Sequence, residues 1–243
     1  MLIPYDEFVR RADAVRARIA EACAAAGRQA GEVELMAVTK ARPAAAVEYA
    51  ARYGLRSVGE NRVQEAVEKR AGSKAAVRWE LIGHLQSNKA KLAVRHFDRV
   101  QSVDRPKLLD QLEHAAEEAG VVLPVFLQIN AGNDPAKFGA EPTAAAALLE
   151  AALGRPHLRV EGLMTIAPLG DDDASTADHA ARTFATLRAL RDDLAGRFGT
   201  PLRELSMGMT GDLAHAVAAG STLVRVGTAL FGAREVFPAQ KTG

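Results

Sequence analysis

The feature that most constrains this chain is a regular alternation of short apolar runs with longer helical patterns. Eight runs are nearly continuously apolar and rich in β-branched residues, which is typical of strands buried on both faces of a parallel sheet. The predicted strands are 34–39, 56–59, 79–83, 99–103, 121–130, 159–166, 204–207 and 223–226. The predicted helices are 43–53, 63–71, 87–94, 105–119, 142–152, 176–198 and 211–219, and a further helix at about 5–26 precedes the first strand.

Eight strand–helix units in about 250 residues fit a closed (β/α)8 TIM barrel, here with an extra N-terminal helix. The competing α/β architecture is a doubly wound open sheet, which usually has a glycine-rich turn after its first strand. Residues 39–43 contain no glycine. The chain also has no linker-like, low-complexity or repeated segment. We therefore predict one domain over 1–243, with the barrel at about 33–235.

Composition excludes several classes of protein. The net charge of +1 gives no electrostatic footprint for nucleic acid. The single cysteine, Cys23, excludes an internal disulfide and a cysteine-rich metal site, and its place on an apolar helix stripe predicts a packed thiol. The acidic run 171–173 is expected to precede a helix, without a metal. No signal-peptide pattern and no apolar run of about 18 residues is present. We expect a cytoplasmic protein without a membrane or nucleic-acid partner.

Polar residues gather where the predicted strands end, which is the face that carries the chemistry of such barrels. Lys40 ends the first strand. A lysine held in a concave mouth is partly desolvated, which lowers the pKa of its ammonium and exposes a neutral amine. Such an amine attacks aldehydes, of which pyridoxal 5′-phosphate (PLP) is the commonest held in this way. Most strand-end lysines are solvated or paired, so this pattern alone leaves both interpretations open.

The loops after the seventh and eighth strands predict a phosphate site. Ser206 and Thr228 offer hydroxyls, and Gly208, Gly211 and Gly227 let backbone N–H groups approach an anion closely. Turn and cap residues have the same composition, which is the ordinary interpretation of either loop alone. Together, and opposite a lysine on the first strand, the two loops favour phosphate binding.

Other strand-end residues have two interpretations each. Arg225 either faces a ligand or pairs with a strand-end acid. Asn61 and Asn130 either touch a ligand hydroxyl or cap their strands. Glu60 either acts as a base or pairs with Arg62 or a lysine, and the pairing is expected.

Two further residues of the mouth have open roles. His84 is expected to hydrogen-bond within its own loop rather than act as a catalytic base. Lys137 is either an auxiliary cation or a loop charge.

The chain resembles the pyridoxal phosphate homeostasis protein family, which consists of small barrels related to the N-terminal domain of alanine racemase. The resemblance covers nearly the whole chain. Its motifs are A-V-T-K at 37–40, G-E-N-R-V-Q-E at 59–65, I-G-H-L-Q-S-N-K at 82–89, G-L-M-T-I at 162–166, L-S-M-G-M at 205–209 and G-S-T-L-V-R-V-G-T-A-L-F-G at 220–232. Where the family pattern has Met-Ser, this chain has Met209-Thr210, which keeps the hydroxyl.

The resemblance implies PLP as the cofactor, covalently bound as an aldimine to Lys40. It implies that Asn61 lines the pocket and that Arg225 faces the pyridine nitrogen. The phosphate would be held by Ser206, with the backbone at Gly208 and Gly227, and by Thr228. No metal ligand and no catalytic residue is implied.

The resemblance further implies a protein that carries or buffers PLP in vitamin B6 and amino-acid homeostasis, and not an enzyme. Proton transfer on both faces of an amino-acid α-carbon needs an acid and a base, and Lys40 serves only one face. The tyrosines, Tyr5, Tyr49 and Tyr53, follow no predicted strand, and we expect no closing second domain. The alternatives are a weak PLP-dependent racemase or related enzyme, an interaction module, and a barrel for another phosphorylated metabolite. PLP-dependent apoenzymes are possible partners of a chain that we expect to be a monomer.

Overall fold

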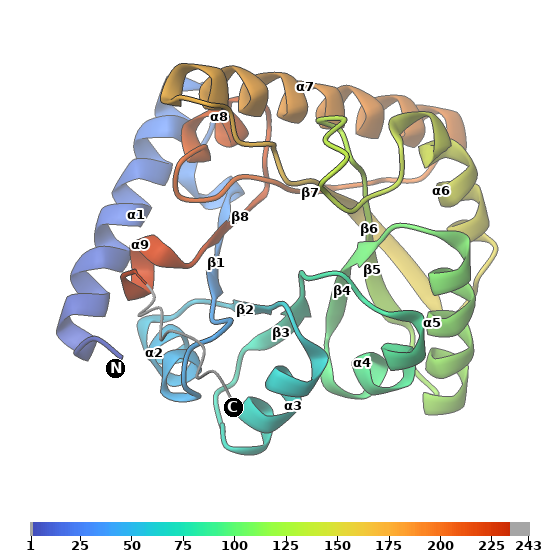
Figure 1. Ribbon diagram of the computed structural model, residues 1–243, viewed down its shortest axis with the longest axis horizontal. Coiled ribbons are helices and arrows are strands. Elements are labelled where there is room, and N and C mark those ends of the chain that lie inside the picture. Colours follow the sequence, from blue (N-terminus) through green and yellow to red (C-terminus); the bar gives the residue numbers. More distant parts are fainter. Residues whose placement is uncertain (1, 234–243) are drawn as a thin grey trace, which may run out of the picture.

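Eight parallel strands close into a barrel in the computed structural model, which describes residues 2–233 (Figure 1). The strand order around the barrel follows the sequence, from β1 to β8, and β8 pairs with β1. The strands are β1 Glu34–Val38, β2 Ser57–Glu60, β3 Arg78–Leu81, β4 Arg99–Val103, β5 Leu123–Gln128, β6 Leu158–Met164, β7 Glu204–Ser206 and β8 Leu223–Val226. The predicted TIM barrel is therefore confirmed; its predicted end at residue 235 lies outside the described residues.

Helices surround this barrel as an outer layer (Figure 1). They are α1 Tyr5–Ala25, α2 Ala45–Tyr53, α3 Val63–Ala71, α4 Ala90–His96, α5 Pro106–Ala119, α6 Ala145–Leu153, α7 Asp173–Phe198, α8 Leu213–Ala218 and α9 Thr228–Phe231. Short 3-10 helices, η1 Ala30–Glu32, η2 Ser87–Lys89 and η3 Pro142–Ala144, precede β1, α4 and α6. The extra helix α1 contacts α2, α8 and α9, so it covers the barrel beside β8 and β1.

The boundaries differ from the prediction where local chemistry decides them. Helix α7 begins three residues early because the Asp172 carboxylate accepts the Ser175 backbone N–H and caps the helix. Strand β5 is shorter than predicted at both ends, and Val121 and Val122 are exposed before it. The four-residue helix α9 was not predicted, because one turn has no periodicity to detect.

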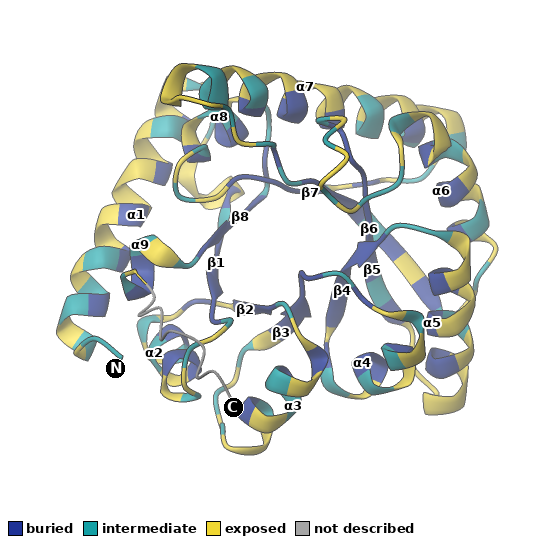
Figure 2. Cartoon of the chain, viewed as in Figure 1, coloured by how far each residue is buried: buried dark blue, intermediate teal, exposed yellow. Residues whose placement is uncertain are grey.

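The apolar core lies mainly between the strands and the helices, where strand residues such as Leu35 and Ala37 are fully or almost fully buried (Figure 2). Met36 and Val38, which alternate with them along β1, belong to a separate small cluster with Ile82 and Leu223. Because successive strand residues point to opposite faces, this second cluster lies in the barrel interior. The parity of each strand therefore tells which side chains face inward.

Candidate functional site

The seven predicted site residues come from the ends of four consecutive strands, β7, β8, β1 and β2. Parallel pairing places Met36 of β1 opposite Arg225 of β8, and Val38 of β1 opposite Gly59 of β2. Because the carboxyl ends of parallel strands meet at one edge, the residues that follow these strands share one part of the barrel mouth. They are Ser206 and Gly208 from β7, Arg225, Gly227 and Thr228 from β8, Lys40 from β1 and Asn61 from β2.

Lys40 lies two residues beyond β1 and is half-buried. The Thr39 backbone N–H donates to the Gly59 carbonyl, so the pairing of β1 with β2 continues to the residue before the lysine. Along this strand Met36 and Val38 face the barrel interior. If the alternation of β1 continues to residue 40, the Lys40 side chain faces the same side, and we keep this as a prediction.

A buried ion cluster behind the barrel wall holds the backbone beside Lys40. We call Glu60, Glu65 and Lys69 the wall cluster. Lys69 Nζ lies 2.7 Å from each of three oxygens: the Thr39 carbonyl, Glu60 Oε1 and Glu65 Oε1. The predicted pairing of Glu60 with a lysine is confirmed.

The wall cluster also fixes the residue after the lysine. Ala41 has a φ of 55°, a left-handed conformation that is uncommon outside glycine, and its backbone N–H donates to Glu65 Oε1. The two peptide groups that flank Lys40 are therefore both tied to the cluster. Burial raises the pKa of Glu60, and the hydrogen bonds from Lys69 and Thr39 oppose this shift.

Arg225 is a buried cation with neutral hydrogen-bond partners. Its Nη1 donates to Ser206 Oγ at 2.7 Å, and its Nη2 donates to the Thr165 carbonyl at 2.8 Å. Within residues 2–233, no carboxylate lies within ion-pair distance of it, so the alternative of a salt bridge is wrong. Burial lowers the pKa of Arg225 to about 10, opposed by the charge of Asp212. The group is still cationic at neutral pH.

The remaining residues of the predicted phosphate site lie around this arginine. Ser206 is fully buried, and its hydroxyl donates to Gln101 Oε1 at 2.6 Å. Gly208 has a φ of +96°, and a Cβ there would lie 2.4 Å from the Ala216 Cβ, so only glycine fits.

The β8 side of the predicted phosphate site is more accessible. Gly227 is half-buried and passes close to the Val38 carbonyl of β1. Thr228 is exposed at the first position of α9.

Asn61 and His84 lie in neighbouring loops. A Cβ on Gly83 would lie 2.3 Å from the Asn61 carbonyl oxygen, so the β3 loop passes directly against the asparagine backbone. The His84 ring stacks on Phe138, with centroids 3.9 Å apart, and its Nδ1 lies 3.5 Å from Asp104 Oδ2. These contacts are with other loops, so the predicted bond within its own loop is not what positions His84.

Asn130 and Lys137 belong to the loop after β5. The Asn130 side chain donates to the Asp134 carbonyl and accepts the Asp134 N–H, so it caps this loop and not the end of its strand. Lys137 is half-buried beside the exposed Phe138. Both interpretations of Lys137, an auxiliary cation and a loop charge, stay predictions.

Sequence reasoning missed two partners of the site, Gln101 and the Thr165 carbonyl. Gln101 is fully buried on β4, where Arg99 and Gln101 alternate with the core residue Val100. Polar residues at every second position of a buried strand are the signal that could have found it. A backbone carbonyl leaves no signal in the sequence.

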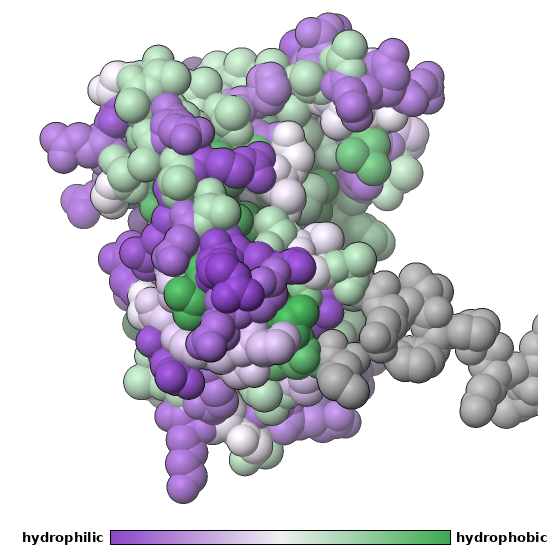
Figure 3. Space-filling view, turned by 90° about the vertical axis from the view of Figure 1, so that its left-hand side faces the viewer, coloured by the Kyte–Doolittle hydropathy of each residue, from purple (hydrophilic) through white to green (hydrophobic). Residues whose placement is uncertain are grey.

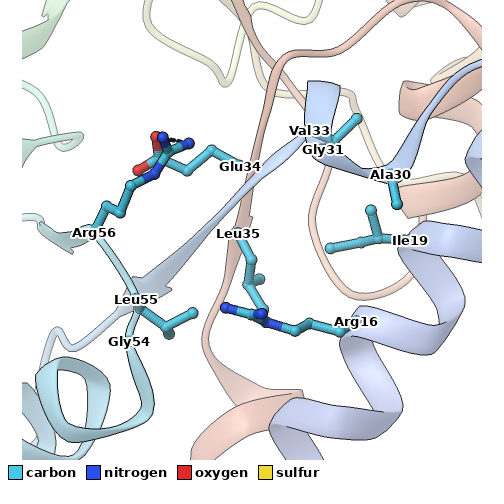
Figure 4. Close-up of a pocket in the computed structure, with 10 residues that line it drawn as sticks. All are labelled: Arg16, Ile19, Ala30, Gly31, Val33, Glu34, Leu35, Gly54, Leu55 and Arg56. Carbon is cyan, nitrogen blue, oxygen red and sulfur yellow. Dashed lines mark ion pairs between the residues drawn. The ribbon is translucent and has the colours of Figure 1, made fainter.

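Two sizeable cavities lie at the opposite end of the barrel from Lys40. One, of about 470 Å³, lies near the start of β1 and β2, where Glu34 forms an ion pair with Arg56 (Figure 4). The other, of about 590 Å³, is lined by residues at the start of β3, β4, β6 and β7. Active sites of such barrels lie at the carboxyl ends of the strands, so we assign the site to the Lys40 end.

Three further features concern metal ligands, membrane-spanning helices and the cysteine. Within residues 2–233, no group of three or more His, Cys, Asp or Glu residues could hold a metal ion. None of the helices in that range combines the length and the apolar character needed to cross a membrane. Cys23 is fully buried, and burial raises the pKa of its thiol, so the predicted packed thiol is confirmed.

The chain matches the family model of the alanine racemase N-terminal domain over residues 11–235. A pyridoxal phosphate homeostasis protein from Pseudomonas aeruginosa is 45% identical over 222 residues, which are 91% of this chain and 93% of that protein. The crystal structure of an unknown protein from Bifidobacterium adolescentis is similar, with a TM-score of 0.86, 36% identity and coverage of 93% of this chain and 95% of that chain. PipY from Synechococcus elongatus, solved with PLP bound, has a TM-score of 0.80, 38% identity and coverage of 93% and 100%.

The fold is thus that of an alanine racemase N-terminal barrel. Within that class, the chain belongs to the pyridoxal phosphate homeostasis protein family.

Proposed function

We propose that this chain binds PLP at the mouth formed by β7, β8, β1 and β2, and that it carries or buffers the cofactor. The observation that carries the proposal is that Lys40, which is half-buried, and Arg225, which is buried, lie at the ends of paired strands. The hydrogen-bond acceptors of Arg225 are a hydroxyl and a carbonyl, and no carboxylate of residues 2–233 forms an ion pair with it. Burying a cation beside neutral groups is unfavourable unless a ligand uses its charge and hydrogen atoms. The PLP bound to PipY supports the choice of ligand.

The residues of the mouth fit the parts of the cofactor. PLP supplies an aldehyde that condenses with amines. We assign Lys40 as the amine, Asn61 as a lining residue and Arg225 as the donor to the pyridine nitrogen. An arginine there keeps that nitrogen unprotonated, because a guanidinium only donates hydrogen bonds.

The phosphate has its own part of the mouth. We assign it to the backbone at Gly208 and Gly227 and to the exposed hydroxyl of Thr228. Ser206 belongs to the proposed site because its hydroxyl contacts Arg225.

We further propose that the bound cofactor is not used for strong catalysis. A racemase needs a second base opposite Lys40. All three tyrosines lie on α1 and α2, on the outside of the barrel, where Tyr5 packs against Tyr49 and the Tyr53 hydroxyl donates to Asp13. None of them belongs to the mouth, which supports a carrier over a racemase.

PLP-dependent apoenzymes are the proposed recipients, and the chain is proposed to act as a monomer. The exposed large apolar side chains of residues 2–233 support this, because they belong to separate loops and helix ends: Val121, Val122, Phe138, Leu153, Leu169 and Met209. The face that carries α1 likewise mixes strongly hydrophilic residues with small apolar patches (Figure 3).

An absorbance scan of the purified protein with added PLP tests the proposal. We expect a visible band that borohydride bleaches, and one labelled peptide that contains Lys40. Lys40→Ala should lose the band, whereas Lys137→Ala, which removes another lysine of the mouth, should keep it. A band that survives in Lys40→Ala and disappears in Lys137→Ala would refute the assignment.

The same preparation tests the absence of catalysis. Incubation of the PLP-loaded protein with L-amino acids should yield D-isomers or keto acids no faster than free PLP does. Faster product formation that is lost in Lys40→Ala would establish an enzyme instead.

A further inference from the structure

A continuous chain of buried side chains crosses the barrel interior and ends at Arg225. Gln101 Nε2 donates to Glu80 Oε2 at 2.6 Å, Ser206 Oγ donates to Gln101 Oε1 at 2.6 Å, and Arg225 Nη1 donates to Ser206 Oγ at 2.7 Å. We call Glu80, Gln101, Ser206 and Arg225 the interior chain. All four residues are at most 4% exposed.

The two ends of the interior chain fix the direction of every hydrogen bond in it. Arg225 can only donate, and Glu80, ion-paired with Arg99, accepts. Gln101 must therefore turn its NH₂ group toward Glu80 and its oxygen toward Ser206. Ser206 has one hydroxyl hydrogen, which goes to Gln101, so its lone pairs accept the hydrogen of Arg225.

We propose that Gln101 is a positioning residue for the ligand site, acting through Ser206 to orient the Arg225 guanidinium. The inference rests on the proposed function and extends it. With Nη1 held by Ser206 and Nη2 held by the Thr165 carbonyl, the guanidinium plane is fixed at two points. A fixed donor loses less entropy when it binds a ring nitrogen, which raises affinity.

The direction of these hydrogen bonds also determines which residues of the mouth can bind the phosphate and which serve the ring. The hydroxyl hydrogen of Ser206 is committed to Gln101, so none is left for a phosphate oxygen. The serine side chain thus serves the ring end of the site through Arg225. The phosphate is left to the backbone at Gly208 and Gly227 and to Thr228.

Nuclear magnetic resonance of the ligand-free protein, labelled with ¹⁵N-arginine, tests the positioning directly. Hindered rotation should give Arg225 resolved Nη signals, assigned by their absence in Arg225→Lys. We expect Gln101→Met and Ser206→Ala to lose these signals. Gln128→Met is the matched control, because Gln128 is also a buried glutamine but donates to the Phe138 carbonyl, outside the interior chain.

Binding of two probes gives the second readout. The probes are PLP and its 1-deaza analogue, whose ring has a carbon in place of the pyridine nitrogen. We expect Gln101→Met to weaken PLP about tenfold, the size of one charge-assisted hydrogen bond, and to leave the analogue unchanged. Ser206→Ala should behave alike, which keeps the test informative if the glutamine variant does not fold.

The outcomes separate the inference from the proposed function. Retained Arg225 signals in both variants, or an equal loss of affinity for the two probes, would overturn the positioning role of Gln101. A wild-type protein that binds neither probe would overturn the proposed function, while the signals of the ligand-free protein would still decide whether Gln101 orients Arg225.

Discussion

Two buried arginines at opposite ends of the barrel interior have opposite surroundings. Arg99, at the start of β4, makes two hydrogen bonds to Glu80 and one to Glu161, and it lies over the Phe126 ring. Arg225, in β8 near the mouth, has a hydroxyl and a carbonyl as its acceptors. Carboxylates thus compensate the charge of Arg99, whereas Arg225 has only neutral acceptors.

The pKa values of the two arginines express this difference. Burial alone would lower the pKa of Arg99, but the hydrogen bonds and charges of Glu80 and Glu161 outweigh burial and raise it. Burial lowers the pKa of Arg225 to about 10, because only the charge of Asp212 opposes it. Removing one partner of a buried ion pair destabilises the fold, whereas a buried cation without a carboxylate partner has its charge available to a ligand. The comparison assigns the amino-terminal end of the barrel to stability and the mouth to binding.

The largest effect is expected from a substitution that removes the buried ion pairs of Arg99. Arg99→Met should lower the free energy of unfolding by about 3–5 kcal/mol, because it leaves Glu80 and Glu161 without their main cation. Denaturant unfolding measures this loss. Arg159→Met is the control, since its exposed ion pair with Glu161 should contribute about 0–1 kcal/mol. Equal losses in the two variants would contradict the special role of Arg99.

The second prediction concerns a substitution that removes the buried cation of the mouth, Arg225. Arg225→Met should cost less stability than Arg99→Met, about 1–3 kcal/mol, because it leaves only the neutral acceptors Ser206 and Thr165 unpaired. Affinity for PLP, measured by absorbance titration, should fall at least tenfold. If this variant unfolds as readily as Arg99→Met but still binds PLP normally, the division between stability and binding is wrong.

The third prediction extends the comparison of buried charges to a carboxylate, Glu60 of the wall cluster. Burial raises its pKa above 4.5 in the folded protein, so the stability that its neutral form contributes is present below pH 4.5 and is lost as pH rises through the folded pKa. The amide that Glu60→Gln introduces resembles the neutral acid at every pH. The free energy of unfolding of Glu60→Gln should therefore rise relative to that of the wild type as pH increases from about 4 to 7. Unfolding experiments at several pH values measure this difference. A difference that is constant with pH would contradict the raised pKa.

The smallest effect is expected outside the barrel, where the Tyr53 hydroxyl donates to Asp13 at 2.6 Å. Burial, together with that bond, raises the pKa of Tyr53 to about 12. Tyr53→Phe should cost about 1 kcal/mol at neutral pH, and this contribution should disappear as pH rises from about 10 through 12. Ultraviolet titration follows the phenol, and Tyr49→Phe, which removes a hydroxyl from the same helix, is the control. An ordinary titration near pH 10 would contradict the prediction.

The sequence allowed most of the barrel and much of the mouth to be predicted, because both depend on local patterns. Apolar runs placed all eight strands, and the order of parallel strands brought Lys40, Asn61 and Arg225 to one face. The wall cluster was only half predicted: Glu60 was expected to find a lysine, but Lys69 could not be selected, because its choice depends on how α3 packs on β2.

By itself, then, the sequence determined the order of elements, the closed barrel, the family and which residues follow the strands. Only the tertiary structure decided that Ser206 bonds to Gln101, 105 positions away, and that Arg225 has no carboxylate partner within residues 2–233. The physical reason is that strand and helix patterns are set by neighbours in the chain. The partner of an inward-facing polar group is set by the register in which distant strands close the barrel.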